Sequence, residues 1–565
     1  MNVLLIWPVF PKSYWSFESV LELVGKKALV PPLGMVTVAA LLPQDWSFRL
    51  VDKNVRNISE DDWAWADMVM LSAIIVQRDD FLATIREAKR RGLPVAVGGP
   101  YVTSVPEDAE AAGADHIVMD EGEITIPMMV GELRGDPGWR RAEGEDARRY
   151  TALNRKPEMH ETPVARFDLL DLDAYDMMAV QYSRGCPFLC EFCDIINLYG
   201  RVPRTKPVDR MLAEFQALHD LGWRGGVFLV DDNFIGNKKN VKALLTELRE
   251  WQHLRGVPFF LQTEASIDLA ADEELLDLMI DCNFDAVFLG IETPDVDSLE
   301  LTRKHQNNRG PMSDAVRNIH RKGMRVMSGF IIGFDGESPG AGDRIVDFVE
   351  QCNITHGLLS MLQVLPNTGL YTRLAKEGRL KPDGLGTVNQ TTILNFVPTR
   401  PAAEITREYL GALRRLYDPV DYMGRVYRYT MEAGLDRPPP YRGGPAAQPS
   451  APKGGISLDE LGDQLRLYRA AARLIWRQGV QRESRRVFWK YAWSVWRTRP
   501  ERLGDFLVLC AHNEHFVELT EYTVRHMEPQ IPGLPDDVEE AQARDHHASR
   551  RAVAAGVWRG QGEAG

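Results

Sequence analysis

The sequence Ser183-Arg-Gly-Cys-Pro-Phe-Leu-Cys-Glu-Phe-Cys-Asp194 spaces Cys186, Cys190 and Cys193 as C-x3-C-x2-C. These residues are half of the six cysteines in the chain. Thiolates hold iron–sulfur clusters, and a 4Fe-4S cubane usually takes four of them. Three cysteines in one short loop therefore predict a cluster in which one iron stays open to another ligand.

A zinc site or a disulfide would use the same residue type. Structural zinc usually joins two separated pairs of cysteine or histidine ligands, and no second C-x2-C or H-x3-H pair follows in this sequence. The other cysteines, Cys282, Cys352 and Cys510, lie singly along the chain. This distribution is typical of buried thiols, so the spacing favours the iron–sulfur cluster over both alternatives.

The cysteine motif resembles that of the radical S-adenosylmethionine enzymes. In that family the amino and carboxylate groups of the methionine moiety bind the open iron. The reduced cluster then donates an electron to the sulfonium, which releases a 5′-deoxyadenosyl radical. The resemblance places the aromatic residue before the third cysteine, here Phe192, beside the adenine. It implies a 4Fe-4S cluster and S-adenosyl-L-methionine as cofactors.

Composition and charge narrow the class of protein. With 565 residues the chain is too long for one hydrophobic core, and its hydrophobic share of 44% is ordinary for a soluble protein. It contains no apolar run long enough to cross a bilayer and no basic leader segment, so we expect a cytoplasmic protein with reduced thiols. A formal net charge of −13 disfavours a nucleic-acid partner.

The amino-terminal part alternates buried strands with helical segments. Strand patterns occur at residues 2–7, 48–52, 68–72 and 95–98. This alternation predicts an α/β fold with a doubly wound, Rossmann-like sheet in residues 1–145. Such sheets bind ligands at the carboxyl ends of their strands, where Asp52, Ser72, Gly98 and Gly99 fall. The two glycines would let a cofactor approach the backbone closely.

This part of the chain resembles the cobalamin-binding domain that precedes the catalytic domain in many radical S-adenosylmethionine enzymes. The likeness rests on Pro-Pro-Leu-Gly at 31–34, on Ser72, on Gly-Gly-Pro at 98–100 and on Asp-Glu-Gly-Glu at 120–123. It implies cobalamin as a third cofactor, with Ser72, Gly98 and Gly99 among its contacts. A Rossmann-like domain without a cofactor is the alternative.

One departure from the cobalamin pattern bears on the cobalt. The D-x-H-x-x-G signature, which supplies a histidine to cobalt, is absent. Asn54 occupies the histidine place in the nearest match, which begins at Asp52, and His116 stands in a different context. We therefore expect no histidine ligand, with the lower face of the cobalt left to water or to a loop such as residues 73–78.

A connector rich in Arg, Glu, Gly and Pro is expected at residues 146–171, before a second strand and helix alternation. Strand patterns at residues 179–183, 226–230, 259–263, 286–290, 326–332 and 358–365 predict a partial (β/α)6 barrel in residues 172–385. Parallel barrels carry their working residues on the loops that follow the strands. The cysteine loop follows the first of these strands, as that architecture requires.

The resemblance implies S-adenosylmethionine contacts at Phe192, Asp232, Asn233, Glu264, Glu292, Gly329 and Gly333. Carboxylates after the strands can accept charge-assisted hydrogen bonds from the methionine ammonium or bind ribose hydroxyls. The glycine-rich G-G-E form of the family is missing. In the strand that resembles G-x-I-x-G-x-x-E, Gly336 stands where glutamate is expected and Glu337 comes one residue late.

Residues 386–532 are expected to form a mostly α-helical carboxyl-terminal region, with a linker at about 436–455 and a disordered tail at 533–565. Within it, residues 466–502 hold eleven Arg or Lys against two Glu, interleaved with Trp476, Phe488, Trp489, Tyr491, Trp493 and Trp496. Such a helix could rest on an anionic membrane surface, which would make the protein peripheral to the membrane, or it could pack in the core.

The whole arrangement resembles cobalamin-dependent radical enzymes that include hopanoid C-methylases. The likeness implies a methyltransferase that adds methyl to an unactivated carbon of a small-molecule or lipid substrate, supplied with electrons by a flavodoxin or ferredoxin. Ring formation or carbon–carbon coupling would use the same parts. A cobalamin or iron–sulfur sensor is the non-enzymatic alternative. RNA methylthiolation is disfavoured because no second cysteine cluster accompanies the triplet.

Overall fold

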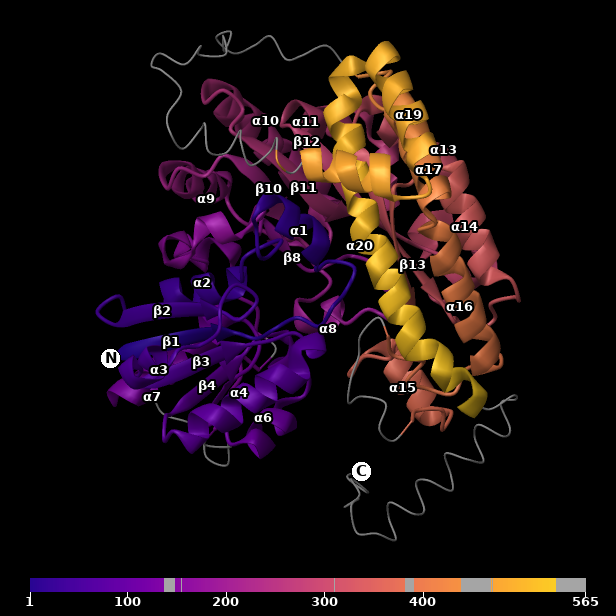
Figure 1. The fold of residues 1–565 in the computed structure, drawn as a ribbon. Helices are drawn as coiled ribbons and strands as arrows, with labels where there is room; N and C mark the ends of the chain where they lie inside the picture. The colour runs from indigo at the N-terminus through magenta and orange to yellow at the C-terminus, as the bar shows by residue number, and fades with distance from the viewer. Residues whose placement is uncertain are drawn as a thin grey trace.

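A computed structural model describes residues 1–136, 148–153, 155–308, 310–381, 391–437, 469 and 471–534. The chain folds into two parallel α/β units and a helical region that covers the second of them (Figure 1). The predicted fold class is confirmed. Most of the expected linker, from residue 438 on, and the expected tail from residue 535 on lie outside the described residues.

The amino-terminal sheet is parallel throughout, in the order β2-β1-β3-β4-β5-β6. Its strands are β1 (Asn2–Trp7), β2 (Ser47–Asp52), β3 (Met68–Ser72), β4 (Val95–Gly98), β5 (His116–Val118) and β6 (Arg149–Tyr150). Its helices are α2 (Leu33–Leu41), α3 (Glu60–Trp65), α4 (Arg78–Arg90), α5 (Pro100–Ser104), α6 (Pro106–Ala112) and α7 (Gly122–Arg134). Separate hydrophobic clusters cover its two faces, as a parallel sheet requires.

The four strands predicted in this unit are confirmed, three of them to the residue, and two further strands lie beyond them. β5 and β6 have three and two residues, too few to show a periodic pattern. β6 lies within the stretch expected as a connector. It is held beside β5 because Asp120 Oδ2 accepts a hydrogen bond from Ala152 N at 2.9 Å.

The second sheet is also parallel, in the order β14-β13-β12-β11-β10-β7. Its strands are β7 (Met177–Val180), β10 (Gly225–Leu229), β11 (Phe259–Ala265), β12 (Phe284–Glu292), β13 (Arg325–Ile332) and β14 (His356–Met361). The helices along it are α8 (Ile195–Leu198), α9 (Val208–Asp220), α10 (Lys238–Leu254), α11 (Glu273–Asp281), α12 (Val296–Leu301), α13 (Met312–Lys322), α14 (Ala341–Gln351) and α15 (Gly369–Lys376). Six strands with helices between them make the expected partial barrel.

Two predicted strands extend well past the observed ones. The first pattern, at 179–183, runs across a break between β7 and β8 (Ser183–Arg184), which pairs antiparallel with β9 (Arg204–Thr205). The last pattern, at 358–365, outlasts its strand, because β14 ends at Met361. The backbone N–H of Val364 donates to Asn395 Oδ1 at 2.8 Å instead of joining the ladder.

The helical region consists of α16 (Ala402–Leu416), α17 (Pro419–Glu432), α19 (Arg485–Thr498) and the long α20 (Leu503–Met527). It shares one hydrophobic core with the barrel. The amino-terminal segment also joins this core: α1 (Glu18–Val24) packs against α20, and the Tyr14 and Phe516 rings stack at 5.1 Å. The segment after β1 and the long carboxyl-terminal helix thus pack together against the barrel, as the neighbouring labels of α1 and α20 in Figure 1 indicate.

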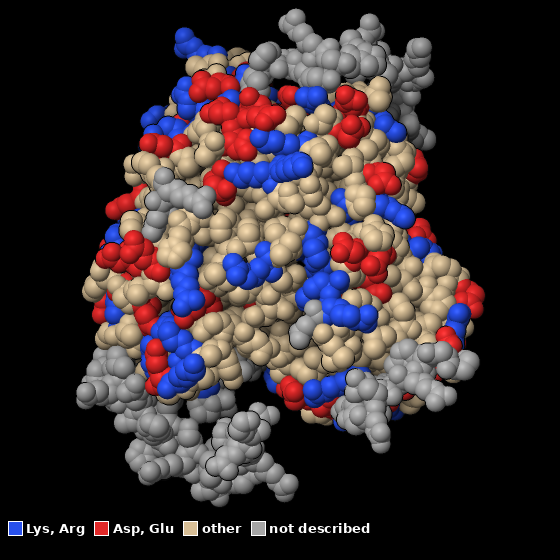
Figure 2. All heavy atoms as spheres, turned by 180° about the vertical axis from the view of Figure 1, so that it is seen from behind, with Lys and Arg blue, Asp and Glu red and all other residues tan. Residues whose placement is uncertain are grey.

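Acidic and basic side chains are interspersed over the face shown in Figure 2, around a centre where uncharged residues predominate. That face therefore offers no extended field of one sign. Among the described helices, none combines the length and the apolar character that a membrane crossing needs.

Candidate cofactor site between the two sheets

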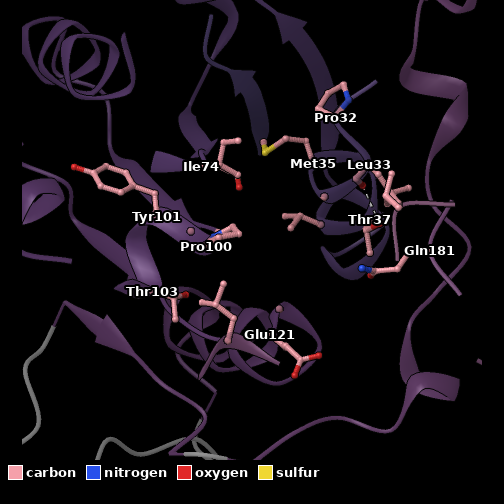
Figure 3. A pocket seen from close by; sticks show the side chains of 18 of the residues that line it. Pro32, Leu33, Met35, Thr37, Ile74, Pro100, Tyr101, Thr103, Glu121 and Gln181 are labelled. Carbon is pink, nitrogen blue, oxygen red and sulfur yellow. Dashed lines mark hydrogen bonds between the residues drawn. The ribbon is translucent and has the colours of Figure 1, made fainter. Parts of the chain in front are cut away.

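A cavity of about 710 Å³ lies where the carboxyl ends of the two sheets face each other. The amino-terminal unit contributes Ser72, Gly98 and Gly99, and the barrel contributes Asp232 and Glu264. Figure 3 shows side chains of α2 and α5 around this space, with Gln181, from the segment between β7 and β8, beside Thr37. Five of the predicted contact residues, drawn from both proposed cofactor sites, thus line one cavity.

The glycines after β4 allow the strand ends to pack tightly below the cavity. Gly99 has a φ of 91°, and a Cβ there would lie 2.2 Å from Ser72 Oγ. A Cβ on Gly98 would lie 3.0 Å from the Val118 carbonyl oxygen. Any side chain at Gly99 would therefore strain the backbone and displace Ser72. The two glycines thus keep the strand ends close together at this edge of the cavity.

The walls of the amino-terminal half fit a large cofactor with apolar ring faces, such as a corrin. Pro32, Leu33, Ile74 and Pro100 lie around it (Figure 3). No histidine lines the cavity within the described residues. His116 Nδ1 is hydrogen-bonded to the Tyr150 hydroxyl at 3.0 Å, outside the cavity lining.

Asp52 and Asn54, the nearest match to the cobalt-ligand signature, bond to each other at 2.7 Å and are absent from the lining. Ile74, in the loop expected near the lower face of the cobalt, does line the cavity. The residues present thus fit cobalamin held without a protein histidine.

The cysteine loop begins beside the barrel half of the cavity, after β8. Gly185 has a φ of 96°, and a Cβ there would lie 2.9 Å from the Gly200 carbonyl oxygen. Its N–H donates to Asp232 Oδ2 at 3.0 Å, and Cys186 N–H donates to the Gly200 carbonyl at 3.2 Å. These bonds turn the chain so that three thiols can gather on one side of it.

Cys186, Cys190 and Cys193 are free thiols of intermediate burial. In the described part of the chain, no three His, Cys, Asp or Glu side chains are close enough to share one metal ion. A cubane instead binds each thiolate to a different iron, so it needs a wider set of ligands. Burial raises the pKa of the Cys193 thiol, so cluster binding must displace protons. The donor set fits a 4Fe-4S cluster rather than a single ion.

Three polar residues follow β10, namely Asp231, Asp232 and Asn233, and their side chains have different partners. Asp231 accepts hydrogen bonds from Tyr182 N at 2.7 Å and Ser183 N at 2.8 Å, and so fixes the strand before the cysteine loop. Asp232 faces the cavity, and burial raises its pKa to about 6. Asn233 is buried and donates to Ser266 Oγ at 3.2 Å, and it is absent from the lining.

Glu264, at the end of β11, is an unpaired acid in the cavity lining. It forms no hydrogen bond or ion pair with another described residue. Burial raises its pKa to about 8, and the nearby charges of Asp232, Glu292 and Asp231 add to this. Glu264 is therefore largely a neutral carboxylic acid at pH 7, able to donate as well as accept a hydrogen bond.

Glu292 is engaged elsewhere. It has a φ of 64°, uncommon for a residue with a side chain, and it pairs with the buried Lys304. The Lys304 ammonium lies 5.8 Å from the centre of the Phe192 ring, and Gln306 Nε2 lies 3.7 Å from Cys190 Sγ. Sequence reasoning missed Lys304 and Gln306, which approach the cysteine loop from the segment after α12. Residues 302–308 are polar throughout, so no signal in the sequence distinguishes these two buried side chains from surface ones.

Gly329, in β13, and Gly333, directly after that strand, also lie outside the cavity lining. A Cβ on Gly329 would lie 3.1 Å from the Phe288 ring. Gly333 has a φ of 104°, and its N–H donates to Glu337 Oε2 at 2.9 Å. Glu337, one residue later than the family pattern, thus holds the turn that follows the strand. The roles of Phe192, Asn233, Glu292, Gly329 and Gly333 toward S-adenosylmethionine stay predictions.

A buried ionic network joins the two halves of the cavity. Arg184, directly before the cysteine loop, donates to Glu121 at 2.8 Å and pairs with Glu123 at 2.9 Å. Arg204 donates to Glu121 at 2.7 Å, and the Thr162 hydroxyl donates to Glu123 at 2.7 Å. The Asp-Glu-Gly-Glu segment therefore ties the amino-terminal unit to the root of the cysteine loop. We call these five side chains the interdomain network.

Three family models match successive parts of the chain: B12 binding domain at residues 26–130, Radical SAM superfamily at 180–349, and a domain of unknown function, DUF4070, at 368–529. An uncharacterized methyltransferase of Synechocystis sp. is 50% identical over 98% of both chains. The hopanoid C-2 methylase of Rhodopseudomonas palustris is 33% identical over 87% of this chain and 88% of its own. The chain belongs to the B12-binding radical S-adenosylmethionine enzymes.

Solved structures share the fold of this B12-binding radical enzyme. The cobalamin-dependent radical enzyme OxsB aligns with a TM-score of 0.56 at 14% identity, over 97% of this chain and 83% of its own. The methyltransferase TsrM from Kitasatospora setae aligns with a TM-score of 0.54 at 17% identity, over 66% and 76%. The predicted family and its three cofactors are confirmed by these comparisons.

The interdomain network should stabilise the enzyme strongly. We expect Arg184→Met to lower the free energy of unfolding by about 3 kcal/mol, because it leaves buried carboxylates with fewer partners. Burial raises the pKa of Glu123, but Arg184 outweighs burial and holds that pKa below its usual 4.5. The stabilisation is therefore complete above pH 4.5 and is lost as pH falls through the lower folded pKa.

Urea unfolding at several pH values measures this effect. Arg166→Met, which removes an exposed pair with Asp168, is the matched control and should cost less than about 1 kcal/mol. An Arg184→Met loss no larger than that of the control would contradict the network's role.

Glu264→Gln should stabilise the cofactor-free enzyme. Because the folded pKa of Glu264 lies near 8 and its usual value is 4.5, the wild type loses stability as pH rises between these values. Glutamine keeps the neutral shape, so we expect a gain of about 1–3 kcal/mol at pH 7–8 and none at pH 4. The exposed Glu300→Gln should change nothing. Destabilisation by Glu264→Gln at pH 8 would show that the carboxylate is ionised and paired.

Proposed function

We propose that this enzyme transfers a methyl group from cobalamin to an unactivated carbon of a hydrophobic small molecule or lipid. The observation that carries the proposal is the single cavity lined by the strand ends of both units, next to the cysteine loop. Bound here, the cluster and S-adenosylmethionine supply a 5′-deoxyadenosyl radical, and cobalamin supplies the methyl group. The substrate carbon must lie between the source of the radical and the source of the methyl group. A cavity lined by both units can hold it there.

The residues of this chain would bind and orient the reactants. Asp232, which also holds Gly185, can accept a hydrogen bond from the methionine ammonium. Glu264, neutral and unpaired, can donate to a hydroxyl or a corrin side-chain amide that enters the cavity. Gly99 lines the cavity, where a cofactor can approach its backbone. The apolar residues of the lining exclude water, which would quench the chemistry.

The relative named hopanoid C-2 methylase supports a polycyclic, lipid-like substrate for this chain. We further propose a cytoplasmic location, peripheral to the membrane, and an electron donor of the flavodoxin or ferredoxin type. Each turnover would consume two molecules of S-adenosylmethionine and two electrons. One molecule would give methionine and the radical, which leaves as 5′-deoxyadenosine with the substrate hydrogen. The other would supply the methyl group to cobalamin and leave as S-adenosylhomocysteine.

Anaerobic turnover of the reconstituted enzyme tests the proposal. With a hopanoid, a reductant and S-adenosylmethionine carrying a deuterated methyl group, we expect a labelled, methylated hopanoid. 5′-Deoxyadenosine and S-adenosylhomocysteine should form in amounts equal to it. Free tryptophan, which TsrM binds in its solved complex, serves as the polar comparison and should stay unmethylated.

Two variants separate cluster loss from general damage. Cys190→Ala should lose the cluster iron and all 5′-deoxyadenosine, whereas Cys352→Ala, at a buried thiol outside the loop, should retain both. An intact cluster without 5′-deoxyadenosine would favour a sensor. Radical formation with a product that lacks the label and does not need cobalamin would favour ring formation or coupling.

A further inference from the structure

The aromatic residues of the basic carboxyl-terminal segment divide between two faces of α19. Phe488, Ala492 and Val495 are buried toward the shared core. Trp489, Trp493 and Trp496 remain 49%, 62% and 52% exposed. The prediction of a helix packed in the core thus holds for one face and fails for the other. A large aromatic side chain left half in solvent loses about half of its burial energy, so a row of three needs a reason.

The three tryptophans form one continuous strip. At 100° per residue they fall within an arc of about 60° on the helix. The Trp493 and Trp496 rings lie 4.9 Å apart. Trp476 and Val480, 58% and 46% exposed, come from the preceding turns, which Trp489 holds in place by donating to the Gly479 carbonyl at 2.9 Å. We call Trp476, Val480, Trp489, Trp493 and Trp496 the tryptophan ridge.

Basic residues flank the tryptophan ridge. Arg486, Lys490 and Arg497 are exposed and project within about 40° of arc beside the tryptophans. None of the three forms an ion pair with another described residue. Between residues 477 and 499 the sequence has seven Arg or Lys and one acid, Glu483, although acids outnumber bases in the whole chain. The positive charge is therefore local to this helix.

We propose that the tryptophan ridge docks the enzyme on the surface of an anionic lipid bilayer. Tryptophan favours the level of the lipid headgroups, and flanking lysine and arginine add electrostatic attraction to anionic lipids. A second copy of this chain is a poorer occupant, because a symmetric contact would bring both sets of cations together. Helix α19, which carries the three tryptophans, lies away from the amino-terminal sheet (Figure 1), and none of its residues lines the cofactor cavity.

Co-sedimentation of the full chain with vesicles tests the docking. Neutral phosphatidylcholine vesicles and vesicles of phosphatidylcholine with phosphatidylglycerol are compared at low and high salt. We expect binding to the anionic vesicles, weakened by salt. The double variant Trp493→Ala with Trp496→Ala should bind at least tenfold more weakly, because two interfacial anchors are lost.

Matched controls keep the test specific. Leu254→Ala removes an equally exposed apolar side chain elsewhere and should bind like the wild type. Arg486→Gln with Lys490→Gln should lose roughly tenfold on anionic vesicles, whereas Arg210→Gln with Lys239→Gln, exposed outside the ridge, should not.

Three results would overturn the proposal: no vesicle binding by the wild type, equal binding by the ridge variants, or a wild-type dimer that the tryptophan substitutions dissociate. Vesicle binding needs no turnover, so it succeeds or fails separately from methyl transfer.

Discussion

The ionic contact between Glu121, Glu123, Arg184 and Arg204 fixes the geometry on which the rest of the structure depends. Each parallel sheet brings its ligand-binding loops to the carboxyl ends of its own strands. Only a contact between the units can turn those two edges toward one space. Arg184 makes that contact directly before the cysteine loop, so the position of the cluster and the position of the cobalamin cradle are set by the same side chain. Breaking a buried ion pair costs several kcal/mol of stability, so such a pair can hold the two units in one orientation.

The cavity between the two units has two buried acids on one side and an apolar wall on the other. Asp232 and Glu264 both have raised pKa values, because burial penalises their charged forms. Buried acids without partners lower the stability of the cofactor-free protein, and they gain partners when ligands bind. The site thus has a function at a cost in stability. The opposite wall, with Pro32, Leu33 and Ile74, offers surface to a cofactor that is itself large.

Much of this could be predicted from the sequence. The cysteine spacing and the strand patterns are local signals, and topology then places Ser72, Gly99, Asp232 and Glu264 at strand ends. Contacts between distant segments could not be predicted, because the sequence around a residue does not show which distant side chain it will contact. The Asp-Glu-Gly-Glu segment was predicted as part of the cobalamin domain, yet its two glutamates bind arginines more than sixty positions later.

The two faces of α19 show a different limit. Composition identified the basic and aromatic segment, but the buried set Phe488, Ala492 and Val495 and the exposed tryptophans share the same helical spacing. Which set faces the core depends on how α17 and α20 pack against the helix, and that is a tertiary property.

The central claim is that cluster and cobalamin act in one cavity, and electron paramagnetic resonance tests it most directly. The enzyme would be loaded with both cofactors, and the relaxation of the cob(II)alamin signal would be compared with the cluster oxidised and reduced. Neighbouring paramagnets relax each other, so we expect faster relaxation and dipolar broadening when the cluster is reduced. An unchanged cob(II)alamin signal would contradict a shared cavity.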